Sequence, residues 1–211
     1  MILILDNIAA FIIGSTIFLV LMAMQMRTTE MNIDQTSTYM MKNQAASFST
    51  WIEEDLLNLG EHMDKSVTTP FANPFYDQHG NTTSFTFYQD TLNTTVVPAD
   101  TVRIATRYNL AFVGYSTSTG DSTAVYKLER SVRYQTGPWQ DEGESVPLIS
   151  VFRIDMLDMN AQPIADPVAA MTADPTSVRN TRIRFAMVPP IETSRATLNK
   201  IFYGSTLLIP N

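Results

Sequence analysis

The amino-acid sequence predicts an α+β protein in which one long N-terminal helix packs on an antiparallel β-sheet. Three observations lead to this prediction. Residues 7–26 carry no charged side chain, residues 27–66 place apolar side chains at helical spacing without a proline, and residues 67–211 contain short stretches that alternate apolar and polar side chains. We therefore divide the chain into an N-terminal helix, residues 1–66, and one β-rich globular domain, residues 67–211.

The first half of the predicted helix, residues 7–26, is long and apolar enough to cross a membrane. Its large side chains include Phe11 and Phe18, and Gly14 between them marks either a helix-contact face or a tolerated glycine. A cleaved signal peptide is another interpretation, but the stretch is too long for one and the helical pattern continues beyond it. We therefore expect a retained segment that is buried in a membrane or in the core of a filament.

Asp6 stands just before the uncharged run, where an unpaired carboxylate at membrane depth would be costly. Two explanations remain open. The carboxylate could pair with the α-amino group of Met1 in a neighbouring copy and set the axial register between helices. Alternatively, Asp6 could cap the helix by accepting hydrogen bonds from its first free amides.

The second half of the helix, residues 27–66, is predicted to be an amphipathic stalk whose apolar face covers the folded domain. Gly60 is a candidate helix terminus within it, because glycine adopts the left-handed conformation that commonly ends a helix. The side chains predicted to pack on the sheet are Phe48, Ile52, Leu56 and Leu59.

Alternating apolar and polar residues predict six strands in the domain, with turn signals at 118–121 and 136–138. Arg182 and Arg184 fall on one face of a predicted strand, where we expect them to meet carboxylates of a neighbouring strand or subunit. The predicted strands are residues 84–88, 102–108, 124–132, 149–154, 182–188 and 207–209.

Composition narrows the function classes. With 14 basic and 21 acidic residues the formal net charge is -7, so nucleic acid is not an expected partner. The chain has no cysteine, which excludes disulfides and thiolate metal sites. Asn81 and Asn93 each open an Asn-Thr-Thr triplet and are candidate glycosylation sites.

The sequence predicts neither an enzyme nor a cofactor or metal site. His62 and His79 are the only histidines, and their spacing from other residues defines no trio of nucleophile, base and orienting group. Asp155, Asp158 and Asp166, with Asn160, could offer oxygen ligands to calcium. Their spacing does not match a calcium-binding loop, so we expect no metal there.

Several motifs follow one another in a recognisable order. The helix ends in Trp-Ile-Glu-Glu-Asp-Leu-Leu-Asn-Leu-Gly at residues 51–60, Leu128-Glu129-Arg130 lies in a later strand, and an arginine-rich strand spans residues 178–185. A strand that runs into an Asp-rich segment at residues 152–161 lies between them, and the chain ends in Asn211. In these features the sequence resembles the minor pilins of type IV pili and the minor pseudopilins of type II secretion. Two features differ: the family's leader does not precede Met1 in this sequence, which fits either a matured chain or a distant branch whose export differs, and Asp6 stands where the family has a glutamate at the fifth mature position.

The resemblance implies a pilin-like fold and a structural subunit of an extracellular filament that polymerises through its apolar helix. Expected partners are copies of the chain or other pilin-like subunits, together with inner-membrane assembly machinery. The protein would lie in the inner membrane before assembly and in a filament on the bacterial cell surface afterwards. The alternative is a single-pass membrane accessory subunit of a secretion or motor complex that never polymerises. A membrane-anchored enzyme or binding protein is a third interpretation, disfavoured because no catalytic constellation is evident.

Overall fold

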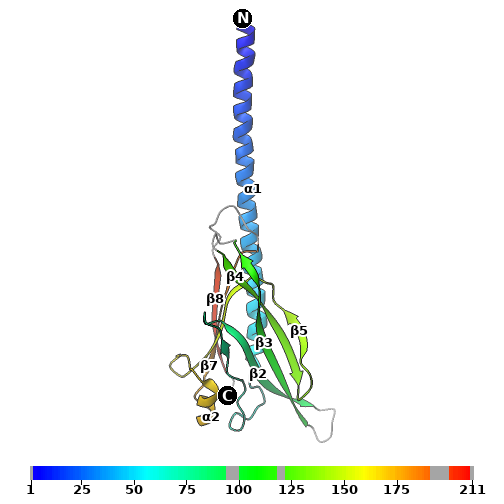
Figure 1. The fold of residues 1–211 in the computed structure, drawn as a ribbon, viewed down its shortest axis with the longest axis vertical. Helices are drawn as coiled ribbons and strands as arrows, with labels where there is room; N and C mark the ends of the chain where they lie inside the picture. The colour runs from blue at the N-terminus through cyan, green and yellow to red at the C-terminus, as the bar shows by residue number, and fades with distance from the viewer. Residues whose placement is uncertain (1, 94–99, 118–121, 191–199, 210–211) are drawn as a thin grey trace.

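A computed structural model describes residues 2–93, 100–117, 122–190 and 200–209. One long helix, α1 (Ile2–Leu57), projects from a β domain and packs against that domain with its C-terminal half (Figure 1). With 56 residues, α1 is about 84 Å long at 1.5 Å per residue. The predicted α+β arrangement is confirmed.

Helix α1 ends at Leu57, earlier than the predicted boundary at residue 66, and turns follow from residue 58. The cause lies at Gly60, whose φ of +74° is left-handed and whose amide donates to the carbonyl of Tyr88 at 2.8 Å. This bond ties the end of the helix to the sheet. A Cβ at residue 60 would lie 2.9 Å from Cβ of Pro70, so only glycine fits here without a shift of its neighbours.

The domain is one antiparallel sheet in the strand order β1-β2-β3-β4-β6-β7-β8, with β5 paired to β4. All six predicted strands are present, whereas β1, β5 and the short helix α2 were not predicted. The exposed β5 has no apolar residue, and β1 and α2 are too short to show a period. The bounds are β1 (Phe75–Tyr76), β2 (Thr82–Asn93), β3 (Asp100–Ser116), β4 (Thr123–Tyr134), β5 (Gln140–Glu144), β6 (Ile149–Leu157), α2 (Pro167–Ala173), β7 (Asn180–Met187) and β8 (Ile201–Leu208).

The core lies between the sheet and the C-terminal half of α1. The ring of Phe48 meets that of Phe185 on β7 edge to face at 4.8 Å, and Trp51 meets Tyr108 on β3 at 6.1 Å. Aromatic contacts from α1 thus reach strands in both halves of the strand order, β3 in one half and β7 in the other. The four helix residues predicted to pack on the sheet are all buried: Phe48, Ile52, Leu56 and Leu59.

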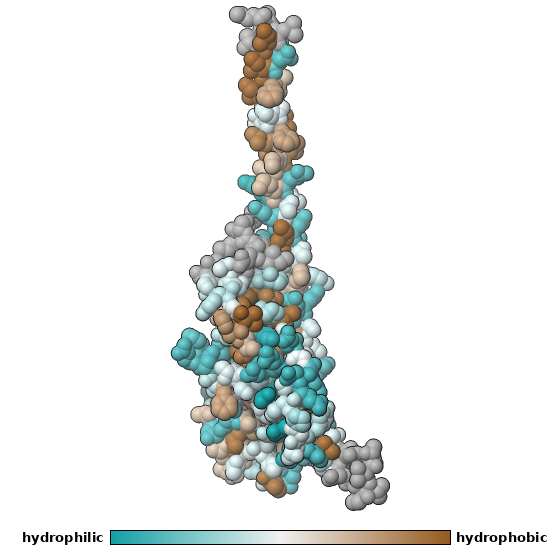
Figure 2. Space-filling view, turned by 45° about the vertical axis from the view of Figure 1, so that its right-hand side comes forward, coloured by the Kyte–Doolittle hydropathy of each residue, from teal (hydrophilic) through white to brown (hydrophobic). Residues whose placement is uncertain are grey.

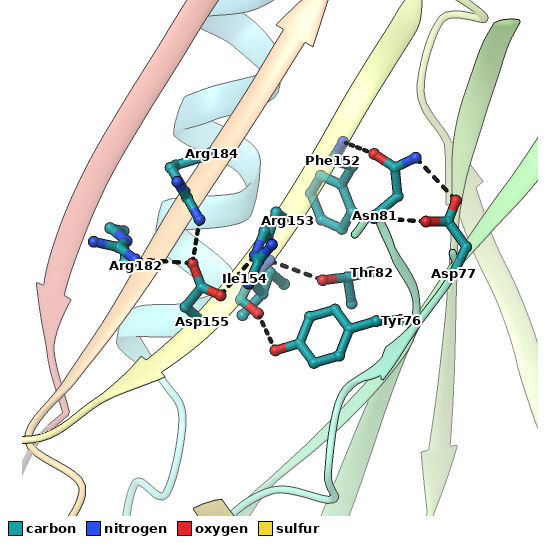
Figure 3. A network of polar contacts seen from close by, with 10 residues as sticks. All are labelled: Tyr76, Asp77, Asn81, Thr82, Phe152, Arg153, Ile154, Asp155, Arg182 and Arg184. Carbon is teal, nitrogen blue, oxygen red and sulfur yellow. Dashed lines mark hydrogen bonds and ion pairs between the residues drawn. The ribbon is translucent and has the colours of Figure 1, made fainter. Parts of the chain in front are cut away.

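The sheet is weakly joined at its middle. Strands β4 and β6 share only the pair Tyr126 and Ile149, so within the described part of the chain β6 lacks a neighbouring strand along most of one edge. Side chains take the place of that strand (Figure 3). The amide of Phe152 donates to Oδ1 of Asn81 at 3.2 Å, and the amide of Ile154 donates to Oγ1 of Thr82 at 2.9 Å. These bonds satisfy backbone groups that would be costly to bury unpaired.

Candidate assembly surface and the contacts that support it

The N-terminal half of α1 presents an apolar surface to its surroundings. Figure 2 shows hydrophobic side chains gathered along the projecting part of the helix, above a domain surface of mixed character. Every side chain from Asp6 to Thr29 is exposed, including Phe11 at 77% and Phe18 at 66%. The large apolar members are Ile8, Phe11, Ile12, Ile13, Ile17, Phe18, Leu19, Val20, Leu21, Met22, Met24 and Met26.

The two hydroxyl groups in the middle of this surface are satisfied inside the helix. Ser15 and Thr16 both donate their hydroxyls to the carbonyl of Ile12, at 2.9 and 2.8 Å. A Cβ added at Gly14 would meet no other atom within 4 Å, so the glycine leaves a shallow site where a second helix could approach closely. By length and composition, α1 is able to span a membrane.

Asp6 lies inside α1 rather than at its start, because the helix already begins at Ile2. The capping explanation is therefore wrong, since an N-cap residue must precede the first helical turn. The carboxylate is exposed on the helix surface near its N-terminal end. Met1, the other member of the expected pair, lies outside the described residues.

A partly buried ionic cluster joins the sheet to the helix. Arg130 on β4 donates through Nε and Nη2 to the two carboxylate oxygens of Asp55 on α1, at 2.6 and 3.1 Å. Tyr108 on β3 donates to the same carboxylate at 2.6 Å, and Glu142 on β5 also contacts Arg130. Strands β3 and β4 are therefore bonded directly to one helical residue, and β5 is joined to it through Arg130. Sequence reasoning placed Asp55 and Arg130 in two separate motifs and did not pair them, because they are 75 positions apart.

The electrostatics of this cluster follow from burial and charge. Burial raises the pKa of Tyr108 well above its usual value, and the neighbouring Asp55 carboxylate raises it further. Burial alone would lower the pKa of Arg130, but its bonds to Asp55 and Glu142 outweigh that effect and raise it. Tyr108 therefore stays a neutral donor and Arg130 stays charged.

A second ionic cluster lies on the outer face of the sheet and is centred on Asp155 of β6 (Figure 3). This carboxylate is 2% exposed and accepts from Arg153 at 2.7 Å, Arg182 at 3.1 Å and Arg184 at 2.6 Å. The prediction that Arg182 and Arg184 meet a carboxylate of a neighbouring strand is confirmed. Burial alone would raise the pKa of Asp155, but the three guanidinium groups reverse this and lower it.

The structure argues against a glycan at Asn81. Its side chain is 5% exposed, donates to Asp77 at 2.9 Å and accepts from the amide of Phe152. We therefore correct the expectation for Asn81, because its amide is engaged inside the fold. Asn93 is the last residue of β2, and the other two residues of its triplet, 94 and 95, lie outside the described part of the chain.

The remaining candidates for site chemistry have local structural roles. Asp158 accepts from the amides of Asn160 and Gln162 in a turn, and Asp166 caps α2 by accepting from the amide of Ala169. Among the described residues, no group of three His, Cys, Asp or Glu side chains is placed to hold a metal ion.

The two histidines also lie apart from any such group. His62 is exposed beside Glu61 at 3.5 Å, and His79 lies in the turn before β2, where its ring contacts Gln78 at 3.2 Å.

Comparison with models of protein families, with curated proteins and with solved structures finds no match to this chain. The fold assigns the protein to a class that is defined by architecture. It is an α+β protein with a helix that is apolar and exposed at one end and integrated into a sheet domain at the other.

Proposed function

We propose that this chain is a structural subunit of an extracellular type IV pilus-like or pseudopilus filament and that it polymerises through α1. The division of one continuous helix into two environments carries the proposal. From Met41 onward α1 contributes to the core of its own domain, whereas the surface from Asp6 to Thr29 is exposed and largely apolar. So large an apolar surface calls for lipid or other helices to cover it.

The energetics favour two locations for this surface. Removing apolar area from water contributes about 25 cal/mol per Å². Lipid and a bundle of like helices both remove this apolar area from water. The subunit therefore stays in the inner membrane until it is assembled. Transfer into a filament then needs assembly machinery, and the selection of partners depends on the polar and packing features of the surface. Asp6 and Gly14 are the features that a lipid environment does not require.

The contacts between helix and sheet suit such a subunit. Because Asp55 binds Arg130 and Tyr108, a force applied to the helix passes directly to the sheet. In a filament with the apolar helices at its centre, the β domains would form the outer shell and contact the domains of other copies or of other pilin-like subunits.

The proposal is tested by shearing surface structures from producing cells, imaging the sheared fraction by electron microscopy and identifying its subunits by mass spectrometry. We expect filaments that contain this chain. Asp6→Ala should stop incorporation while the protein stays in the membrane, and Asp90→Ala in the domain serves as a control that removes one carboxylate elsewhere. Unchanged filament yield from Asp6→Ala would remove the proposed role of Asp6. A chain found only in the membrane fraction would favour the accessory subunit instead.

A further inference from the structure

A hollow on the outer face of β6, β7 and β8 is a candidate binding site separate from the apolar surface of α1. It encloses about 480 Å³ and is lined by Arg153, Arg184, Val151 and Phe202, among others. Arg184 neighbours Phe185, which packs on Phe48 of α1, so strand alternation directs Arg184 to the face away from the helix. The volume falls in the range of small-molecule sites, roughly 300–1,000 Å³.

Two glycines leave room above the arginines. Gly204 on β8 pairs with Arg184 on β7 and presents no side chain, and an added Cβ would come no closer than 3.8 Å to the Arg184 side chain. Gly80, with a φ of +81°, lies beside Arg153, and a Cβ there would be 3.0 Å from its Nη1. The guanidinium groups are therefore reachable from the hollow.

The hollow carries a local excess of positive charge. Of the three arginines that surround Asp155, two line the hollow, Arg153 and Arg184, although the chain as a whole has a net charge of -7. Side chains of Arg153 and Arg184 remain 38% and 45% exposed. Each guanidinium has five N–H donors in a planar fork that matches a carboxylate, and Asp155 occupies only part of this set.

An apolar row lies beside the arginines in the hollow, because Val151 and Phe202 flank Ala186 of β7, two residues along from Arg184. Phe202 is 75% exposed and Val151 is 40% exposed, so both can be covered by a ligand without unfolding any part of the domain. An aromatic side chain next to cationic groups favours a ligand that has a flat apolar face as well as a charge.

We propose that this hollow binds a small molecule that carries a carboxylate on a ring, with the carboxylate on Arg153 and Arg184 and the ring against Phe202 and Val151. The exposed guanidinium donors supply the charge recognition, and the aromatic wall excludes water from one face of the ring. Asp155 acts as the positioning residue, because it holds the arginines from below without reaching the ligand.

The test is a ligand-observed NMR titration of the full chain in detergent micelles, where filament assembly plays no part. Benzoate and 2-naphthoate are the probes, inorganic phosphate tests charge alone, and benzyl alcohol tests the ring alone. We expect at least one ring carboxylate to bind with higher affinity than phosphate or benzyl alcohol. Arg184→Gln and Phe202→Ser should each weaken that binding by about tenfold, as expected for one charge-assisted hydrogen bond or one aromatic contact.

Arg103→Gln is the matched control, because it removes the same charge from a pair with Asp90 that does not line the hollow. It should leave binding unchanged. The proposal is overturned if neither carboxylate binds, if phosphate binds as tightly, or if Arg103→Gln weakens binding as much as Arg184→Gln. Since filaments are absent from the measurement, these outcomes leave the proposed assembly function untouched.

Discussion

At the scale of single residues, a bidentate ion pair between helix and sheet joins the partly buried side chains of Asp55 and Arg130. Their side chains are only 16% and 17% exposed, so removal of one partner leaves a largely desolvated charge without compensation. Removal of the Asp55 side chain would also take away the acceptor of the Tyr108 hydroxyl. The pair therefore matters more for keeping the domain in place than an ion pair at the surface would.

We predict that Asp55→Asn lowers the free energy of unfolding by about 3 kcal/mol, because it strips the countercharge from Arg130. Chemical denaturation in micelles measures this by tryptophan fluorescence in a Trp139→Phe background, where the signal comes from Trp51, whose ring lies 6.1 Å from that of Tyr108. Asp90→Asn should cost less than about 1 kcal/mol, because the Arg103 side chain that it leaves unpaired is 41% exposed and can be solvated. Equal losses in the two variants would show that the buried pair has no special role.

The Asp155 cluster predicts a pH dependence. Because the pKa of Asp155 is lowered in the folded protein, its ionised form contributes stability that is present above the unfolded pKa and is lost as the pH falls through the folded value. This contribution to stability is therefore lost at pH values below about 4, the ordinary pKa of an aspartate. We expect the difference in unfolding free energy between the wild type and Asp155→Asn to be constant between about pH 5 and about pH 7 and to shrink below about pH 4. A difference that grows on acidification would contradict this assignment.

At the scale of elements, α1 combines two surfaces in one uninterrupted helix. The same residue type behaves differently in each half, since Phe48 is 5% exposed and Phe11 is 77% exposed. Burial against β6 and β7, rather than helix propensity, makes the C-terminal half part of the domain.

This contrast gives a matched pair of substitutions. Phe48→Ala should destabilise the domain by about 3–5 kcal/mol, because it removes a ring from a packed aromatic cluster and leaves a cavity. Phe11→Ala should leave the unfolding of the domain unchanged. Denaturation curves of both variants, recorded side by side in micelles, measure the difference. A domain that tolerates Phe48→Ala would show that α1 is only loosely attached.

The junction between helix and sheet depends on Gly60. Gly60→Ala should destabilise the protein by more than about 1 kcal/mol, since alanine is strained at positive φ and its Cβ would meet Pro70. Gly114→Ala on β3 is the control, because its added Cβ has no neighbour within 4 Å. Thermal unfolding followed by circular dichroism measures both. Similar melting temperatures for the two variants would contradict the account of the helix end.

At the scale of the whole molecule, the exposed apolar half of α1 governs solubility and association. Phe18→Glu places a charge in the middle of this surface, where lipid or neighbouring helices would be expected. We predict that it reduces recovery in the membrane fraction severalfold and abolishes filament incorporation. Leu57→Glu, at an exposed position beyond the apolar half, should affect neither. Cell fractionation with immunoblotting measures both variants, and normal membrane recovery of Phe18→Glu would refute a buried role for this surface.

The sequence by itself determined the α+β class, the apolar and amphipathic halves of α1, the four residues that pack on the sheet and the approximate positions of six strands. These properties could be predicted because helical and strand periods are local and repeat over many residues. The exact partners of the charged residues could not, since strand order and register decide which distant side chains meet.

Only the tertiary structure decided which polar residues act together. It paired Asp55 with Arg130, gathered three arginines around Asp155 and assigned Asn81 to the open edge of β6. It also ended α1 at Leu57, because Gly60 bonds to β2 and turns the chain onto the sheet. Each of these outcomes arises from contacts between segments far apart in the chain, and a local pattern carries no information about them.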